Sequence, residues 1–343
     1  ICEISIPLTG EGSINTLYNN MTKQTTENED YGIYTLGDDN FFAGIVASIN
    51  SLRYHNYHGP IAVIDIGYEE WMYDYLSSYD NVSVLDIKPV CKDIRFVDVL
   101  SDECPVMKGW AYKAFSILYY NLFENWTFID GDYFPMCNLE SELKPKIEQG
   151  FFVCTEDGSN TWEEHHMDAI GVKPGNYLNI NAGFISLNMN KYGYIIHEWR
   201  NLMTRYKPFD LWYGDQGALN AILDKYEVEK TCVNKVLWNQ TWMNTEMVAE
   251  NKCRLRKDGD DIFVLYEPLN SKIMGWHGML WYKLWHQIGI DHYRKDNEEE
   301  RSKFYRECQR KSPQAIVEVF RNFLFMNTYN KRLTQKDHLL VVE

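Results

Sequence analysis

The stretch Trp126-Thr127-Phe128-Ile129-Asp130-Gly131-Asp132 joins an apolar run to two carboxylates with a glycine between them. Such a run is typical of a strand buried on both faces of a parallel sheet. Ligands of open α/β sheets bind outside the carboxyl ends of the strands, where Asp130 and Asp132 would lie. Carboxylates there could hold a hard divalent cation against phosphate oxygens, but Asp-Gly is also a favoured turn. The triplet alone leaves both interpretations open.

Strand and helix patterns alternate on both sides of this stretch. Apolar runs predict strands over 31–36, 61–66, 82–87, 126–130, 151–155 and 183–188, and further strands over 262–265 and 273–276. Helical patterns occupy 40–55, 69–79, 110–123 and 214–225. Strands that alternate with helices predict an α/β fold with a mostly parallel sheet and helices on both faces.

The domain organisation follows from shifts in composition. Residues 1–30 are polar and predict an arm, residues 31–290 form the main domain, and residues 291–343 carry a charged run and then an amphipathic stretch. We expect a C-terminal helical extension there. It could pack on the domain, support self-association with a second copy, or contact a membrane surface.

Composition excludes several classes of protein. The 343 residues carry 34 Lys+Arg against 49 Asp+Glu, a formal net charge of −15, and 45% are hydrophobic. A disordered chain and a nucleic-acid-binding partner are therefore not expected, and no transmembrane segment is visible. We expect a cytoplasmic protein, although a segment removed upstream of Ile1 could place it in a secretory compartment. The eight cysteines form no Cys-x-x-Cys pair, so reduced thiols are expected.

Several segments in a fixed order resemble glycosyltransferase family 8, whose members have a GT-A (Rossmann-like) fold. The segments are Thr35-Leu36-Gly37-Asp38-Asp39-Asn40-Phe41, Tyr112-Lys113, Asp130-Gly131-Asp132, Asn181-Ala182-Gly183, Gly214-Asp215-Gln216-Gly217-Ala218-Leu219-Asn220, and His277 with Lys283 and Trp285. The resemblance implies metal-dependent transfer of a hexose from a nucleotide-sugar, expected to be a UDP-sugar. The acceptor would be a hydroxyl group of a glycan, a glycolipid or a protein.

The resemblance also implies binding roles. Asp130, Asp132 and His277 would hold Mn²⁺ or Mg²⁺, which suits a diphosphate leaving group. The donor nucleotide-sugar would contact eight residues, namely Thr35, Asp38, Asn40, Lys113, Gly131, Asn181, Gly278 and Lys283. Gly278 directly follows His277 instead of standing three positions on, and Leu284 replaces the family's proline. The loop around the diphosphate is therefore expected to differ from the family pattern.

Three residues are the candidates for catalysis. The resemblance implies retention of anomeric configuration, and Gln216 stands where a nucleophile would be needed for double displacement. An amide there favours front-side displacement. Asp157 and Asp215 could bind sugar hydroxyls, or serve as the carboxylate base of an inverting enzyme.

Other interpretations of these residues remain open. Asp38 and Asp215 could cap helices, and Lys113 could be a surface lysine. A nucleotidyltransferase on a related fold would need a glycine-rich, basic loop, whereas Gly37-Asp38-Asp39-Asn40 is acidic. A non-catalytic sugar- or nucleotide-binding protein on the same fold is the remaining alternative.

Overall fold

The computed structural model describes residues 29–92, 105–156, 179–205 and 214–233, residue 238, and short strand segments at 240–241, 253–258, 261–266, 269–271 and 273–275. Residues 1–28 of the predicted arm and the whole predicted C-terminal extension lie outside the described residues. The strands and helices of the predicted main domain that fall within these ranges are present, with boundaries that differ by a few residues.

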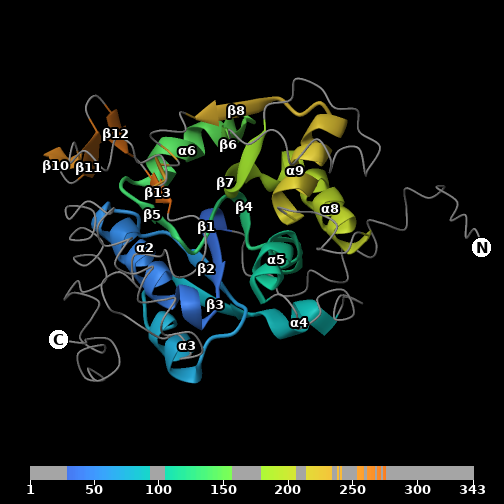
Figure 1. Cartoon of the computed structure of the whole chain (residues 1–343), viewed down its shortest axis with the longest axis horizontal. Helices are drawn as coiled ribbons and strands as arrows, with labels where there is room; N and C mark the ends of the chain where they lie inside the picture. The colour runs from blue at the N-terminus through green and yellow to red at the C-terminus, as the bar shows by residue number, and fades with distance from the viewer. Residues whose placement is uncertain are drawn as a thin grey trace, which may run out of the picture.

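A seven-stranded sheet forms the centre of the molecule, in the order β3-β2-β1-β4-β7-β6-β8 (Figure 1). Its strands are β1 (Glu29–Gly37), β2 (Ile61–Asp65), β3 (Val82–Asp86), β4 (Phe123–Ile129), β6 (Phe152–Glu156), β7 (Ile180–Asn188) and β8 (Lys230–Val233). All neighbouring pairs are parallel except those of β7, which is antiparallel to both β4 and β6. The prediction of a mostly parallel sheet flanked by helices is thus confirmed, and β7 is the strand that runs against the others. Antiparallel neighbours need no crossover helix between them.

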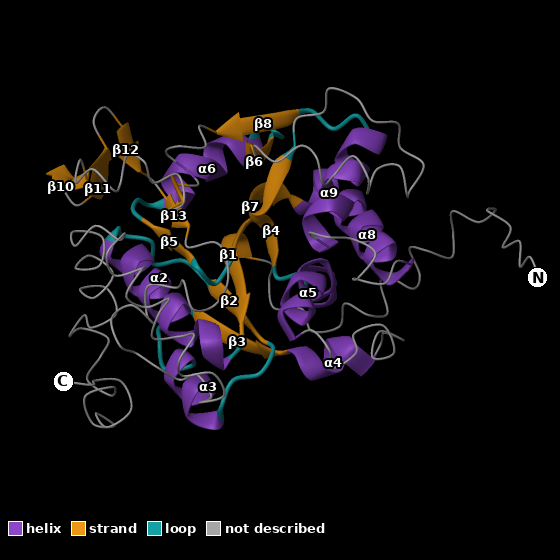
Figure 2. Ribbon diagram, in the orientation of Figure 1, coloured by secondary structure: helices purple, strands orange, loops and turns teal. Residues whose placement is uncertain are grey.

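Helices cover both faces of this sheet (Figure 2). One hydrophobic cluster joins α2 (Phe42–Tyr54), α3 (Glu70–Leu76) and α6 (Leu139–Glu148) to the sheet, and the other joins α4 (Ile87–Lys92), α5 (Pro105–Tyr120), α8 (Met189–Arg205) and α9 (Gly214–Lys225). Successive residues of a strand point to opposite faces of the sheet. On β1, Ile33 belongs to the first cluster and Tyr34 to the second. Among the described residues, no helix is long and apolar enough to cross a membrane.

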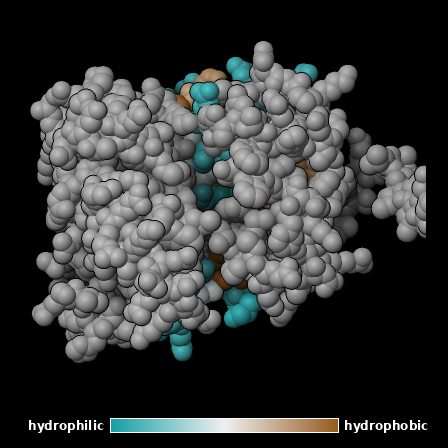
Figure 3. Space-filling view, viewed as in Figure 1, coloured by the Kyte–Doolittle hydropathy of each residue, from teal (hydrophilic) through white to brown (hydrophobic). Residues whose placement is uncertain are grey.

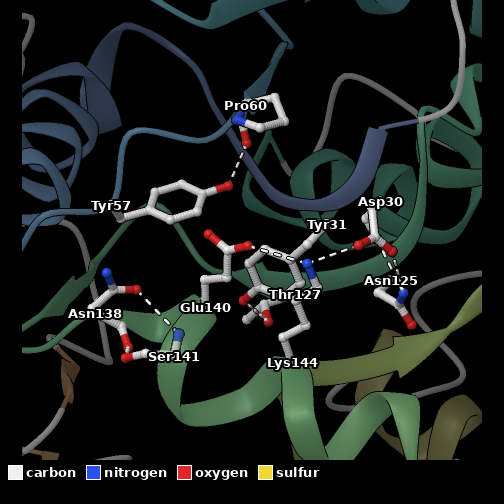
Figure 4. A network of polar contacts seen from close by, with 10 residues as sticks. All are labelled: Asp30, Tyr31, Tyr57, Pro60, Asn125, Thr127, Asn138, Glu140, Ser141 and Lys144. Atoms are coloured by element: carbon white, nitrogen blue, oxygen red, sulfur yellow. Dashed lines mark hydrogen bonds and ion pairs between the residues drawn. The ribbon is translucent and has the colours of Figure 1, made fainter.

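A line of polar contacts fixes β1 against β4 and α6 (Figure 4). The Tyr31 hydroxyl lies 2.7 Å from Thr127 Oγ1, which lies 2.7 Å from Ser186 Oγ on β7. One residue earlier, Asp30 accepts from Lys144 Nζ at 2.7 Å and from Asn125 Nδ2 at 3.1 Å. The first strand therefore begins at Glu29, two residues before the predicted boundary of the arm.

Two small sheets stand apart from the central one. β10 (Cys253–Asp258), β11 (Asp261–Tyr266) and β12 (Leu269–Ser271) form an antiparallel sheet. β5 (Tyr133–Pro135), β13 (Ile273–Gly275) and β9 (Gln240–Thr241) form a mixed sheet, in which β13 is antiparallel to β5 and parallel to β9. The predicted strands near residues 262 and 273 are thus present as β11 and β13. In the second small sheet Gly275 pairs with Tyr133, the residue that follows Asp132.

Candidate active site

The candidate site lies where the order of the sheet reverses. From β1 the chain runs outward to β2 and β3 and then returns to β4 on the other side of β1, so the carboxyl ends of β1 and β4 are neighbours. A Cβ atom added to Gly131, just after β4, would lie 2.8 Å from the Leu36 carbonyl oxygen of β1. The backbones of the two strand ends are in direct contact there, and this point of an α/β sheet is where ligands bind.

A buried lysine joins two carboxylates at this point. The Nζ of Lys113, from the interior of α5, lies 2.8 Å from Asp130 Oδ1 and 2.9 Å from Asp215 Oδ2. Lys113 is 3% exposed and Asp215 is 4% exposed. The idea that Lys113 is a surface lysine was therefore wrong, because its helix faces the sheet and its ammonium group also lies 5.3 Å from the centre of the Phe128 ring.

Burial and the neighbouring opposite charges together shift the pKa values of Lys113 and Asp215. Burial disfavours the charged form of Lys113, but Asp130 and Asp215 outweigh it and raise the pKa of the lysine above its usual range. Burial raises the pKa of Asp215, and the charge of Lys113 opposes that rise. Asp130 is the most exposed of the three side chains and is the one turned toward solvent.

Asn220 on α9 holds the Asp215 end of the site against β7. Its Oδ1 accepts from the Ile180 backbone N–H at 2.8 Å, and its Nδ2 donates to the carbonyl oxygens of Ile180 at 2.9 Å and Gln216 at 3.0 Å. One turn earlier, Gln216 Oε1 accepts from the Ala182 N–H at 3.2 Å. The two amides place the beginning of α9 beside the beginning of β7. The Trp199 indole adds a bond of 2.8 Å to the Asp215 carbonyl oxygen.

Replacing Asn220 by alanine is expected to lower the free energy of unfolding by about 3 kcal/mol, because the substitution removes three buried hydrogen bonds to the backbone of Ile180 and Gln216. Urea unfolding followed by tryptophan fluorescence measures the change. The exposed Asn190, near the beginning of α8, provides an asparagine outside this contact for comparison. A loss below about 1 kcal/mol would contradict a structural role for the amide.

The beginning of β7 packs closely on the turn after β4. Asn181 Oδ1 accepts from the Tyr133 hydroxyl at 2.9 Å and from the Gly183 N–H at 2.8 Å, while the Asp130 N–H donates to the Gly183 carbonyl oxygen at 2.9 Å. A Cβ added to Gly183 would lie only 2.4 Å from Asp130 Oδ2. The absence of a side chain at Gly183 therefore gives the Asp130 carboxylate its position.

Asp130 and Asp132 flank a tight turn, as the Tyr133 N–H donates to the Asp130 carbonyl oxygen at 2.9 Å. This turn is no hairpin, because β5 pairs with β13 and not with β4. In the described part of the chain, no group of three or more His, Cys, Asp or Glu side chains is arranged to hold a metal ion. Two carboxylates still fit a hard cation that takes its other ligands from substrate oxygens and water. Asp215 is instead paired with Lys113.

At the end of β1, Asp38 caps the 3-10 turn η1 (Asp39–Phe41). Its two carboxylate oxygens accept from the backbone N–H and from the side-chain Nδ2 of Asn40, each at 3.0 Å. Burial raises the pKa of Asp38. Thr35 is buried within β1. The capping role considered for Asp38 is thus present, and it fixes both polar side chains at the strand end.

Four predicted site residues, Asp157, His277, Gly278 and Lys283, lie outside the described residues. The structure brings together Lys113, Asp130, Asn181, Asp215 and Gln216 around the ends of β4 and β7. Sequence reasoning missed Tyr133, Gly183 and Asn220 as residues that shape the site. Asn220 and Gly183 lay within the quoted motifs, but their roles depend on contacts between elements: α9 with β7 for Asn220, and β7 with the turn after β4 for Gly183. On the face shown in Figure 3, most of the described side chains that are visible are hydrophilic.

Solved glycosyltransferase structures share this fold. The galactosyltransferase LgtC, in complex with donor and acceptor sugar analogs, superposes with a TM-score of 0.54 at 16% identity, over 81% of this chain and 95% of that chain. An active-site mutant of LgtC gives 0.53 at 17% identity over the same shares. The bifunctional glycosyltransferase WbbM, in its apo form, gives 0.52 at 17% identity over 87% of this chain and 52% of that chain. The predicted GT-A fold is thereby confirmed.

A mannosyltransferase family model matches residues 30–146. The match covers the segment from β1 through α6, which includes Lys113, Asp130 and Asp132. No functionally curated protein matches the sequence.

Proposed function

We propose that this protein is a glycosyltransferase that moves a hexose from a nucleotide-sugar to a hydroxyl group of an acceptor. The observation that carries the proposal is the buried contact of Lys113 with Asp130 and Asp215 at the reversal point of a GT-A sheet. Burying ionised groups costs several kcal/mol per ion unless they are well paired, so such clusters are concentrated at functional sites. The family match and the shared fold support the same activity.

The residues around this cluster suit a diphosphate donor. Asp130 and Asp132 would hold Mn²⁺ or Mg²⁺, which when bound offsets negative charge on the departing diphosphate. Lys113 contacts the Asp130 carboxylate and opposes the rise that burial causes in the pKa of Asp215. His277 would be a third ligand of the cation and Lys283 a contact of the diphosphate; in the sequence His277 comes two positions after Gly275, which pairs with Tyr133.

We also propose that the transferred sugar retains its anomeric configuration. Gln216 offers an amide and no nucleophile, and its Oε1 is directed at the backbone of β7. Asp215 shares its charge with Lys113, which suits binding of sugar hydroxyls better than removal of an acceptor proton. Front-side displacement is consistent with both observations. Proton NMR of the newly formed glycosidic bond tests it, and an inverted anomer would favour Asp157 or Asp215 as a base and overturn the proposal.

Calorimetric titration with UDP, GDP, CDP and ADP, each with Mn²⁺ and with chelator, tests donor and metal together. We expect UDP to bind, and to bind only with metal. In Asp132→Ala the metal-dependent affinity should fall at least about tenfold, because a carboxylate ligand of the cation is lost. Asp74→Ala changes an exposed aspartate of α3 and should leave the affinity unchanged. Absence of nucleotide binding under every condition would favour the non-catalytic alternative.

A further inference from the structure

Two thiols face each other on the last two strands of the central sheet. Cys154 on β6 and Cys232 on β8 are Cα partners in a parallel register, and their Sγ atoms lie 3.5 Å apart. In-register residues of neighbouring strands direct their side chains to the same face, and both belong to the cluster that packs under α5, α8 and α9. The pairing therefore brings together two cysteines that are 78 positions apart in the sequence.

The geometry of the strand pair already meets the needs of a disulfide bond. Neighbouring strands lie about 4.8 Å apart, and the Cα atoms of disulfide-bonded cysteines are usually about 4.4–6.8 Å apart. The sulfur atoms must approach by about 1.5 Å to reach the bonded distance of about 2.05 Å. Side-chain rotation can supply such a movement without a change of register.

The two thiols differ in access and in reactivity. Cys154 is fully buried, while Cys232 is partly exposed. The contact with the Cys154 thiol lowers the pKa of Cys232, and the nearby Lys230 charge adds to this. The same contact and burial raise the pKa of Cys154. An accessible thiol that ionises more readily, beside a buried one, matches an attacking and a resolving cysteine.

We propose that Cys154 and Cys232 form a reversible modification site that low-molecular-weight disulfides oxidise to an intramolecular disulfide. The Cys232 thiolate attacks one sulfur of the small disulfide, which forms a mixed disulfide and releases one small thiol. Cys154 then loses its proton to solvent and attacks Cys232 Sγ, which forms the Cys154–Cys232 bond and releases the second small thiol. Two protein thiols are oxidised and one small disulfide is reduced. The proposal does not depend on the glycosyltransferase activity.

Incubation of the full chain with oxidised glutathione, followed by alkylation and peptide mapping by mass spectrometry, tests the site. We expect a Cys154–Cys232 cross-linked peptide that disappears after addition of dithiothreitol. Cys137, which is buried in the cluster on the other face of the sheet, is an internal control and should remain reduced. If both Cys154 and Cys232 are recovered as free thiols after oxidation of the wild-type chain, the proposal is overturned.

Two variants separate the roles of the cysteines. Cys154→Ala should accumulate one glutathione on Cys232, because the resolving thiol is gone, and Cys232→Ala should leave Cys154 unmodified. Modification of Cys154 in the latter variant would contradict the assigned order. Oxidation of the wild-type chain should also raise the melting temperature by about 5 °C, since the bond closes a loop of 78 residues. An unchanged melting temperature would contradict closure between the two strands.

Discussion

Replacing Lys113 by methionine is expected to lower the free energy of unfolding by about 4 kcal/mol. The substitution keeps most of the volume of the side chain but removes the partner of Asp130 at 2.8 Å and of Asp215 at 2.9 Å, and it leaves Asp215 as an uncompensated charge at a buried position. Removing one partner of a buried ion pair typically costs about 3–5 kcal/mol. Urea denaturation at neutral pH measures the difference, with the wild-type chain as reference.

The loss should depend on pH in a defined direction. Because the pKa of Lys113 is raised, its stabilising contribution is fully present below the unfolded value of about 10.4 and is constant over the working range. The pKa of Asp215 is already raised by burial, and removing the lysine raises it further. A carboxyl group of this kind binds protons more readily in the folded state, so the folded state loses stability as pH rises through that interval. The deficit of Lys113→Met should therefore be larger at about pH 8 than at about pH 5.

Two companion variants identify the source of this loss. Lys113→Arg keeps the positive charge and should recover part of the stability, although the larger guanidinium group fits the space less well. The double variant Lys113→Met with Asp215→Asn removes one orphaned charge and should be more stable than Lys113→Met alone. If Lys113→Met unfolds at the wild-type urea concentration at both pH values, the three side chains are not paired in solution.

Replacing Gly183 by alanine is expected to reduce the rate of sugar transfer by about 100-fold. The new methyl group would lie 2.4 Å from Asp130 Oδ2 and 2.9 Å from Asn181 Oδ1, so the Asp130 carboxylate must move. A misplacement of about 1 Å at a reacting site commonly costs about two orders of magnitude. Steady-state transfer assays and the metal-dependent affinity for nucleotide should both register the change.

Gly193 in α8 offers the matched control. A Cβ there would meet only Met189, with its nearest atom at 3.5 Å, which is ordinary contact distance. Gly193→Ala should leave transfer unchanged and raise the free energy of unfolding by up to about 1 kcal/mol, because glycine is unfavourable inside a helix. Equal activities of the two alanine variants would show that the position of Asp130 does not limit the reaction.

The sequence allowed prediction of those parts of the fold that depend on local pattern. The helix 214–225 and the buried strands on either side of β1 follow from apolar periodicity, and the structure has α9 with those bounds. The direction of β7 could not be predicted, because an apolar strand has the same pattern whichever way it runs. The helices α6 and α8 were missed, although α8 has buried residues at helical spacing, such as Ile195, Trp199 and Met203.

Prediction of the site reached the residue types but not their partners. Asp130, Asp215 and Lys113 were each named. The contact that joins them, however, depends on the packing of α5 and α9 against the same face of the sheet. The role of Asn220 is likewise a contact between a helix and the backbone of a strand, which no spacing in the sequence encodes. Asp38 shows the reverse case, since its cap follows from the local sequence alone.

The hydroxyl contacts of Tyr31, Thr127 and Ser186 influence the geometry of the active site, although they lie away from it. Thr127 faces Ser186 in the register that also sets Ile129 against Phe184, and a slip by two residues would bring Thr127 opposite either Phe184 or Asn188. Such a slip would move Asp130 by roughly 7 Å relative to Gly183, at about 3.4 Å per residue. Three buried hydroxyl groups that do not contact substrate thus fix the register of β4 against β7. That register keeps Asp130 beside Gly183.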